Sequence, residues 1–325
     1  MYNFEAIKAE MLARPPQIHI DSMYTTNSRL LTEALADFLP EECLFKPKNS
    51  KTSVCLGDTV PPGHHLPSRN AFTRRMWAGG SIQGFNGLTL DGREAVCIER
   101  IEDVKVHGSA GSEKIYVEVL RNYLKQHDFT QWQKRGPSEL DLPIDLVEYD
   151  LNGIIEHRTL VFMRELSDEN KIMNLKKEQK VVKAPNNPEH SVTLQPTPTL
   201  LFHYSALSYN AHRIHLDRSY CREVEGYRDL LVHGPLSLTL MLSVLESGLN
   251  GLGYEINKID YRHLAPLYVD QTMRICCAPR ASKSIEKQDG ITGRNKWDVW
   301  IENQDGGLCV KGTVETMKIS TVHNL

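Results

Sequence analysis

The chain has 325 residues, a formal net charge of −3, and 24% charged and 40% hydrophobic residues, values typical of a soluble globular protein of about two domains. The near-neutral charge excludes the strongly basic proteins that bind nucleic acid or anionic membranes, so we expect neither as a partner. No apolar run reaches the roughly 18 residues that a membrane-spanning helix needs.

Cysteine usage and the N-terminus bear on the cellular compartment. Seven cysteines, an odd number that includes the adjacent pair Cys276-Cys277, fit neither a disulfide framework nor a zinc-binding pattern. The first 21 residues lack the apolar core of a secretory signal, and they carry Glu5, Glu10 and Asp21, which mitochondrial transit peptides usually avoid. The sequence therefore predicts a reducing, cytoplasmic location, with the mitochondrion as the alternative.

The N-terminal half begins with helical signals and continues with strand signals. Residues 27–39 place leucines on one face, as an amphipathic helix does. From about 86 to 166 the pattern alternates as in β-strands, with turn signals at Asp91-Gly92 and at the GSAGS segment of residues 108–112.

The C-terminal half follows a polar, proline-punctuated segment that we interpret as a linker, residues 167–198. Residues 235–249 are apolar almost all the way round, which predicts a buried helix. Strands are expected at 273–278 and over 296–317, with a turn at Asp305-Gly306.

The order of elements predicts an α+β protein of two similar domains. We place the N-terminal domain at residues 1–166, the linker at 167–198 and the C-terminal domain at 199–325. In each domain we expect an antiparallel sheet wrapped around a central helix.

The segment SYNAHRIHLD, residues 208–217, is the leading candidate for chemistry. His215 can take and return a proton near neutral pH, whereas the Asn210 amide can orient a water or hydroxyl but cannot act as a base. Gly234 opens the predicted buried helix, whose first N–H groups favour a developing negative charge. Together these residues suit proton abstraction next to a thioester carbonyl.

Other interpretations of the same residues are structural or metal-binding. A histidine in a polar loop is most often structural, and His233 could serve only to position the start of the helix. The H-x-x-H spacing of His212 and His215 lacks a carboxylate or cysteine at a recognised spacing, so no metal site is predicted. Arg74-Arg75 could meet phosphates, although paired arginines usually lie on a solvated surface.

Several blocks of the chain resemble the double-hotdog, MaoC-like hydratases. The blocks are SALSYNAHRIHLDRSYCREVEGYRDLLVHGPL (205–236), FTRRMWAGGSIQGF (72–85), YRHLAPLYVDQTMRICCAPR (261–280) and IIEHRTLVFMRE (154–165). They are most similar to the branch that holds fungal 3-hydroxyacyl-thioester dehydratase type 2 and the mesaconyl-C4-CoA and itaconyl-CoA hydratases.

This resemblance implies a hotdog fold in each half and assigns roles in the second. The family's D-x-N-P-x-H motif falls on residues 210–215, which makes His215 the catalytic histidine and puts Asn210 where the wider superfamily has aspartate. Gly234 matches the glycine whose N–H binds the thioester oxygen. The first hotdog has no such motif and is expected to shape the acyl tunnel.

Further residues of the matching blocks are expected to bind substrate: His212, Arg213, His233, Arg75 and Trp77. The expected activity is that of a hydro-lyase, adding or removing water at the 2,3-position of an enoyl or 3-hydroxyacyl thioester of CoA or acyl carrier protein. The resemblance implies no cofactor, and either a monomeric pseudo-dimer or a homodimer.

Competing functions use the same scaffold. A fungal secondary-metabolism enzyme could reuse it for dehydration, isomerisation or cyclisation of a polyketide or terpenoid intermediate. A binding protein with a decayed site is disfavoured by the intact N-x-H-R-I-H and H-G-P blocks. A thioesterase is disfavoured because the first two turns of the predicted central helix carry no carboxylate.

Overall fold

The computed structural model describes residues 3–44, 72–85, 87–134, 153–176, 182–185, 187–280 and 296–319. The chain forms two compact units. The first comprises Met1–Arg29 and Pro47–Asp168, and the second comprises Leu30–Lys46 and Glu169–Leu325.

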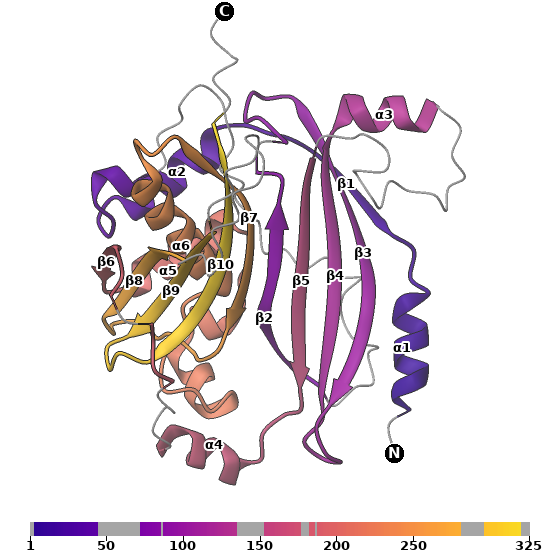
Figure 1. The fold of residues 1–325 in the computed structure, drawn as a ribbon. Helices are drawn as coiled ribbons and strands as arrows, with labels where there is room; N and C mark the ends of the chain where they lie inside the picture. Colours follow the sequence, from indigo (N-terminus) through magenta and orange to yellow (C-terminus); the bar gives the residue numbers. More distant parts are fainter. Residues whose placement is uncertain are drawn as a thin grey trace, which may run out of the picture. The chain divides into compact units, whose positions relative to one another are not determined.

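The first unit is built on long antiparallel strands that lie side by side in the order β1-β3-β4-β5-β2 (Figure 1). Their bounds are β1 Gln17–Ser22, β2 Arg74–Gln83, β3 Glu94–His107, β4 Lys114–Lys125 and β5 Gly153–Met163. The predicted turn at 108–112 joins β3 to β4 as a hairpin, and Gly108 and Gly111 adopt the positive φ angles that glycine tolerates.

Alternation along β4 builds the core of this unit. Ile115, Val117 and Val119 point to one face, where they pack in a buried cluster with Met11 of α1 (Phe4–Leu12). The opposite face is covered by α3 (Gln126–Lys134), whose Phe129 and Trp132 are buried in a second apolar cluster.

The second unit carries antiparallel strands in the order β7-β10-β9-β8-β6. Their bounds are β6 His190–Leu194, β7 Tyr254–His263, β8 Met273–Pro279, β9 Lys296–Asn303 and β10 Leu308–Lys318. The predicted turn at Asp305-Gly306 joins β9 to β10, with Gly306 at a φ of +72°.

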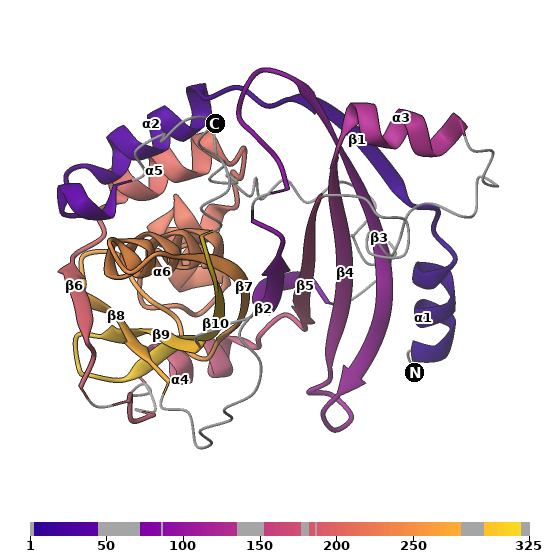
Figure 2. The same ribbon diagram turned by 45° about the horizontal axis from the view of Figure 1, so that its top comes forward.

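The strands of the second unit curve around one long helix, α6 (Gly234–Leu249), as Figures 1 and 2 show. This helix contacts β6, β7, β8 and β9, and it has buried residues on every side because it has almost no polar face to expose. The predicted apolar helix at 235–249 is therefore confirmed.

Shorter helical elements complete the described part of the molecule. They are α2 (Thr26–Leu35), η1 (Glu41–Cys43), α4 (Asp168–Lys176), α5 (Pro198–Leu207), the 3-10 turn η3 (Arg213–His215) and the π-helical turn η4 (Tyr220–Val224). Within the residues described, no helix is long and apolar enough to cross a membrane.

Two boundaries differ from those expected. Residues 167–198 are not only a linker, because they contain α4 and strand β6, which pairs with β8. The segment Leu30–Lys46 belongs to the second unit, where η1 contacts α6. From Leu30 onward, the helix predicted at 27–39 therefore belongs to the second unit and not to the first. The described part of the first unit carries the nine-residue helices α1 and α3.

We predict that Leu240→Ala lowers the free energy of unfolding by about 2–5 kcal/mol, because it leaves a cavity in a close-packed core. Leu240 lies in the middle of α6 and is 0% exposed. The matched control is Leu252→Ala, just beyond α6 and 51% exposed, which we expect to change stability by less than about 0.5 kcal/mol. Urea titrations of both variants test this, and equal effects would show that α6 is not the core of its unit.

Candidate active site

The site begins where α5 ends. Thr197 caps this helix, its side chain accepting the Leu200 N–H. At the other end Tyr209 adopts a φ of +51°, which reverses the chain and turns the next residue, Asn210, into the protein. The backbone N–H of Asn210 then donates to the Ser205 carbonyl oxygen at 2.8 Å, and its side chain is buried.

Asn210 organises the loop that follows it. Its Oδ1 accepts the His212 backbone N–H at 3.1 Å, a local bond that shapes a turn. The His212 ring in turn meets the His215 ring edge-to-face, with 6.0 Å between centroids. The structure therefore brings Asn210, His212 and His215 together, and their roles in catalysis and binding stay predictions.

His215 is buried, and a short hydrogen bond orients its ring. Its Nδ1 lies 2.7 Å from the Leu231 carbonyl oxygen. A carbonyl oxygen can only accept, so Nδ1 must carry the hydrogen and the lone pair of neutral His215 must be on Nε2. The bond thus assigns Nε2 as the proton-accepting atom.

The Leu231 carbonyl is itself fixed by its neighbours. The Leu231 N–H donates to the Ile214 carbonyl oxygen at 2.9 Å, and Leu231 forms an isolated β-bridge with Tyr268. The Cys221 thiol also donates to Ile214 O, at 3.1 Å, and burial raises the pKa of this thiol to about 12, so that it stays protonated.

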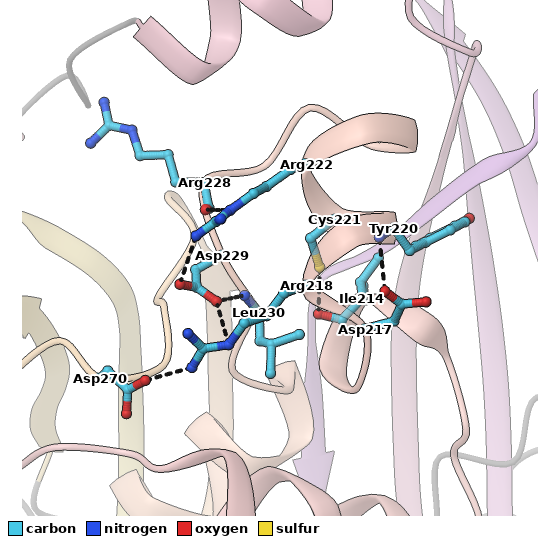
Figure 3. Close-up of polar contacts among 10 residues, drawn as sticks. All are labelled: Ile214, Asp217, Arg218, Tyr220, Cys221, Arg222, Arg228, Asp229, Leu230 and Asp270. Atoms are coloured by element: carbon cyan, nitrogen blue, oxygen red, sulfur yellow. Dashed lines mark hydrogen bonds and ion pairs between the residues drawn. The ribbon is translucent and has the colours of Figure 1, made fainter.

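An ion-pair network braces the segment that leads into Leu231 (Figure 3). Asp229 accepts the Leu230 N–H at 2.7 Å and pairs with Arg218 at 3.3 Å and Arg222 at 3.5 Å. Arg218 also pairs with Asp270, with 2.6 Å between Nη2 and Oδ2. Single exposed pairs contribute little, but this network joins three segments around the backbone that orients His215.

His233 lies directly beneath His215 and immediately before α6. The two rings are stacked, with centroids 3.6 Å apart and planes 19° apart. His233 is 0% exposed, and its Nε2 is 2.9 Å from Ser205 Oγ. Burial, followed by the proximity of His215 and His212, lowers the pKa of His233 well below its usual range, so the ring is neutral.

Gly234 is the first residue of α6. The first N–H groups of a helix have no acceptor within it, and the helix dipole makes them a favourable place for negative charge. Because His215 stacks on the residue just before Gly234, the structure brings the candidate base to the start of the candidate oxyanion-binding helix.

The remaining predicted substrate-binding residues are distributed differently. Arg213 is exposed, pairs with Asp217 at 2.6 Å and lies over the Tyr220 ring. Arg75 and Trp77 lie on β2 of the first unit, where the Trp77 indole donates to the Gly79 carbonyl oxygen. Their roles in substrate binding stay predictions.

Three contributors to the site went unnoticed in the sequence. The Leu231 carbonyl has no side-chain signal, and Asp229 resembles any surface carboxylate until its two arginines are placed beside it. Ser205 is the first residue of the matching block 205–236, but its contact with His233 is not evident from the sequence.

Comparison with known proteins identifies related chains. The family model of hydroxyacyl-thioester dehydratase type 2 matches residues 42–269. The mitochondrial hydroxyacyl-thioester dehydratase type 2 of Schizosaccharomyces pombe is 34% identical over 108 residues, 33% of this chain and 36% of the relative. Mesaconyl-C(4)-CoA hydratase of Chloroflexus aurantiacus is 34% identical over 123 residues, 38% of each chain. The chain therefore matches only a little over a third of the length of these two relatives.

Solved structures support the architecture. A MaoC-like dehydratase from Phytophthora capsici superimposes with a TM-score of 0.59 at 13% identity, covering 97% of this chain and 99% of that one. At this identity the likeness shows the fold alone, and it confirms the predicted α+β hotdog fold.

We predict that neutral His215 carries its hydrogen on Nδ1, because the Leu231 carbonyl can only accept. Nitrogen-15 NMR of histidine-labelled protein distinguishes the two ring nitrogens, and His215→Gln identifies the signal. A hydrogen on Nε2 of the neutral ring would contradict the assigned geometry.

Proposed function

Because the chain belongs to the hydroxyacyl-thioester dehydratase type 2 family, we propose that it adds or removes water at the 2,3-position of an enoyl or 3-hydroxyacyl thioester. The observation that carries this proposal is the bond from His215 Nδ1 to the Leu231 carbonyl oxygen. It leaves one basic nitrogen, Nε2, beside the start of α6.

In the dehydration direction, Nε2 of His215 takes a proton from the α-carbon of the acyl chain. The thioester oxygen, on which negative charge develops, accepts a hydrogen bond from the Gly234 N–H. The α6 dipole also stabilises the charge at this position. Two preorganised features thus act on the same charge.

The hydroxyl at the 3-position then leaves, and the proton held by His215 joins it to give water. Asn210 orients the hydroxyl in this step. An amide cannot carry the proton, so His215 performs both transfers, and both take place on the same face of the acyl chain. Hydration is the same sequence reversed.

The activities named for two relatives support a thioester substrate. One is a hydroxyacyl-thioester dehydratase and the other a hydratase of a CoA thioester. The name of the Schizosaccharomyces pombe relative also includes a mitochondrial location, which supports the mitochondrial alternative for this chain over the cytoplasmic one. Subcellular fractionation separates the two.

We expect His215→Ala to lower kcat/KM for hydration by at least about a hundredfold, since it removes the general base. The measurement is the absorbance change of enoyl-CoA hydration, taken with crotonyl-CoA, mesaconyl-CoA and longer acyl chains, and with acyl carrier protein thioesters. The matched control is His203→Ala, an exposed histidine of α5, which we expect to keep wild-type activity.

Full activity of His215→Ala would overturn the mechanism. If the wild type hydrated none of these thioesters, the proposed reaction would itself be wrong, and a metabolite without a thioester would become the leading substrate class.

Asn210→Asp should keep the acceptor for the His212 N–H while replacing the amide donor with a carboxylate. A negative charge near His215 favours its protonated form. We therefore expect the acidic limb of the kcat/KM profile to move to higher pH, with reduced but measurable activity. An unchanged pH profile would show that residue 210 does not face His215 during the reaction.

A further inference from the structure

The imidazoles of His215 and His233 form a buried stacked pair, and the hydroxyl of Ser205 is hydrogen-bonded to the second of them. Ser205 lies on α5 and is buried, and its Oγ is 2.9 Å from Nε2 of His233. The pair therefore has His215 on the side of the candidate reaction and Ser205 on the side of the core.

Two rings whose centroids are 3.6 Å apart cannot both carry a positive charge in a buried site without strong repulsion. The pair therefore takes up one proton at a time. The titratable groups that face it are His212 from the loop, Tyr204 from α5, 5.0 Å from His233 between centroids, and Cys221 through the Ile214 carbonyl. Among these described groups there is no carboxylate that could offset a second positive charge on the pair.

The hydrogen bonds decide which ring receives that proton. Nδ1 of His233 is buried without a hydrogen-bond partner in the part of the chain that the structure describes. A buried N–H without an acceptor is rarer and costlier than an unused lone pair, so Nδ1 is the lone pair and Nε2–H donates to Ser205 Oγ.

Protonating His233 would place an N–H on that unpartnered Nδ1. Protonating His215 instead adds a hydrogen at Nε2 while Nδ1–H keeps its bond to the Leu231 carbonyl. The resulting imidazolium rests on the face of a neutral aromatic ring, an arrangement that stabilises a cation.

We propose that Ser205 is a positioning residue that fixes His233 as a neutral ring beneath His215, so that the single proton of the pair goes to His215. This proposal rests on the proposed function, in which His215 is the base. Its consequence is that Ser205, which is buried and hydrogen-bonded to His233, sets the pH range in which the enzyme works.

The test is a pair of serine variants on the same helix segment. Ser205→Ala removes the acceptor of the His233 N–H. Ser208→Ala removes a hydroxyl that is equally buried but donates to the Tyr204 carbonyl oxygen at 2.6 Å. Ser205→Thr restores a hydroxyl at the first position and serves as the rescue variant.

The primary readout is the NMR titration of the histidine side chains in the free protein, which needs no substrate. In the wild type we expect His215 to titrate while His233 stays neutral. In Ser205→Ala the stack loosens and we expect His215 to titrate at lower pH, whereas Ser208→Ala and Ser205→Thr behave as the wild type. The proposal would be overturned if His233 took up its proton at a higher pH than His215. It would also be overturned if the titration of His215 were the same in Ser205→Ala as in the wild type.

The second readout is hydration kinetics. We expect Ser205→Ala to lower kcat about tenfold, the effect of leaving one buried donor unpaired, with little change in KM and with the acidic limb shifted to lower pH. Ser205→Thr should recover most of kcat. A rise in KM alone, with kcat and the pH profile unchanged, would contradict a positioning role. If the NMR titrations gave the expected results but the protein hydrated no thioester, the proposed function would be wrong. The role of Ser205 in directing the proton to His215 would still be supported.

Discussion

The hydrogen bond between His215 Nδ1 and the Leu231 carbonyl oxygen is the interaction on which the site depends. It connects the loop after α5 to the extended segment that enters α6, and it determines which ring nitrogen is basic. The surrounding structure serves to hold that carbonyl still. The Ile214 backbone, the Tyr268 bridge and the Asp229 ion pairs each fix a different part of the same segment.

The histidines of the site have opposite environments although they touch. His215 has an acceptor that tolerates the charged ring, whereas His233 is buried with one nitrogen unpartnered among the described residues and is kept neutral. When their environments push the pKa values of two titratable groups apart, the acid and base roles can be assigned from that difference. Here the neutral member also begins the helix whose first N–H group is proposed to bind the thioester oxygen.

The parts of the fold that the sequence predicts well have strong local signals. Residues 235–249 predict a buried helix because they have almost no polar face, and the glycine turns at 108–112 and Gly306 favour their hairpins. Helix α3 lies within residues 86–166, whose pattern predicts strands, and its nine residues are too few to stand out from that pattern. The placement of Leu30–Lys46 in the second unit depends on long-range packing, which no local pattern encodes.

The residues of the candidate site also differ in how well the sequence alone identifies them. His215 and Asn210 are identifiable as candidates because an imidazole and an amide have recognisable chemistry, and Gly234 because it precedes an apolar run that predicts a buried helix. The role of His233 is ambiguous in the sequence, where it could bind substrate or begin a helix. Its complete burial and its stacking on His215 become visible only when the two histidines, 18 positions apart in the sequence, are brought together.

The most direct test of the account is the structure of the protein with a bound, unreactive 3-hydroxyacyl thioester analogue. The account predicts that the thioester oxygen accepts a hydrogen bond from the Gly234 N–H, while Nε2 of His215 faces the α-carbon. An analogue bound with its carbonyl away from the start of α6, or with its α-carbon beyond the reach of His215, would contradict it.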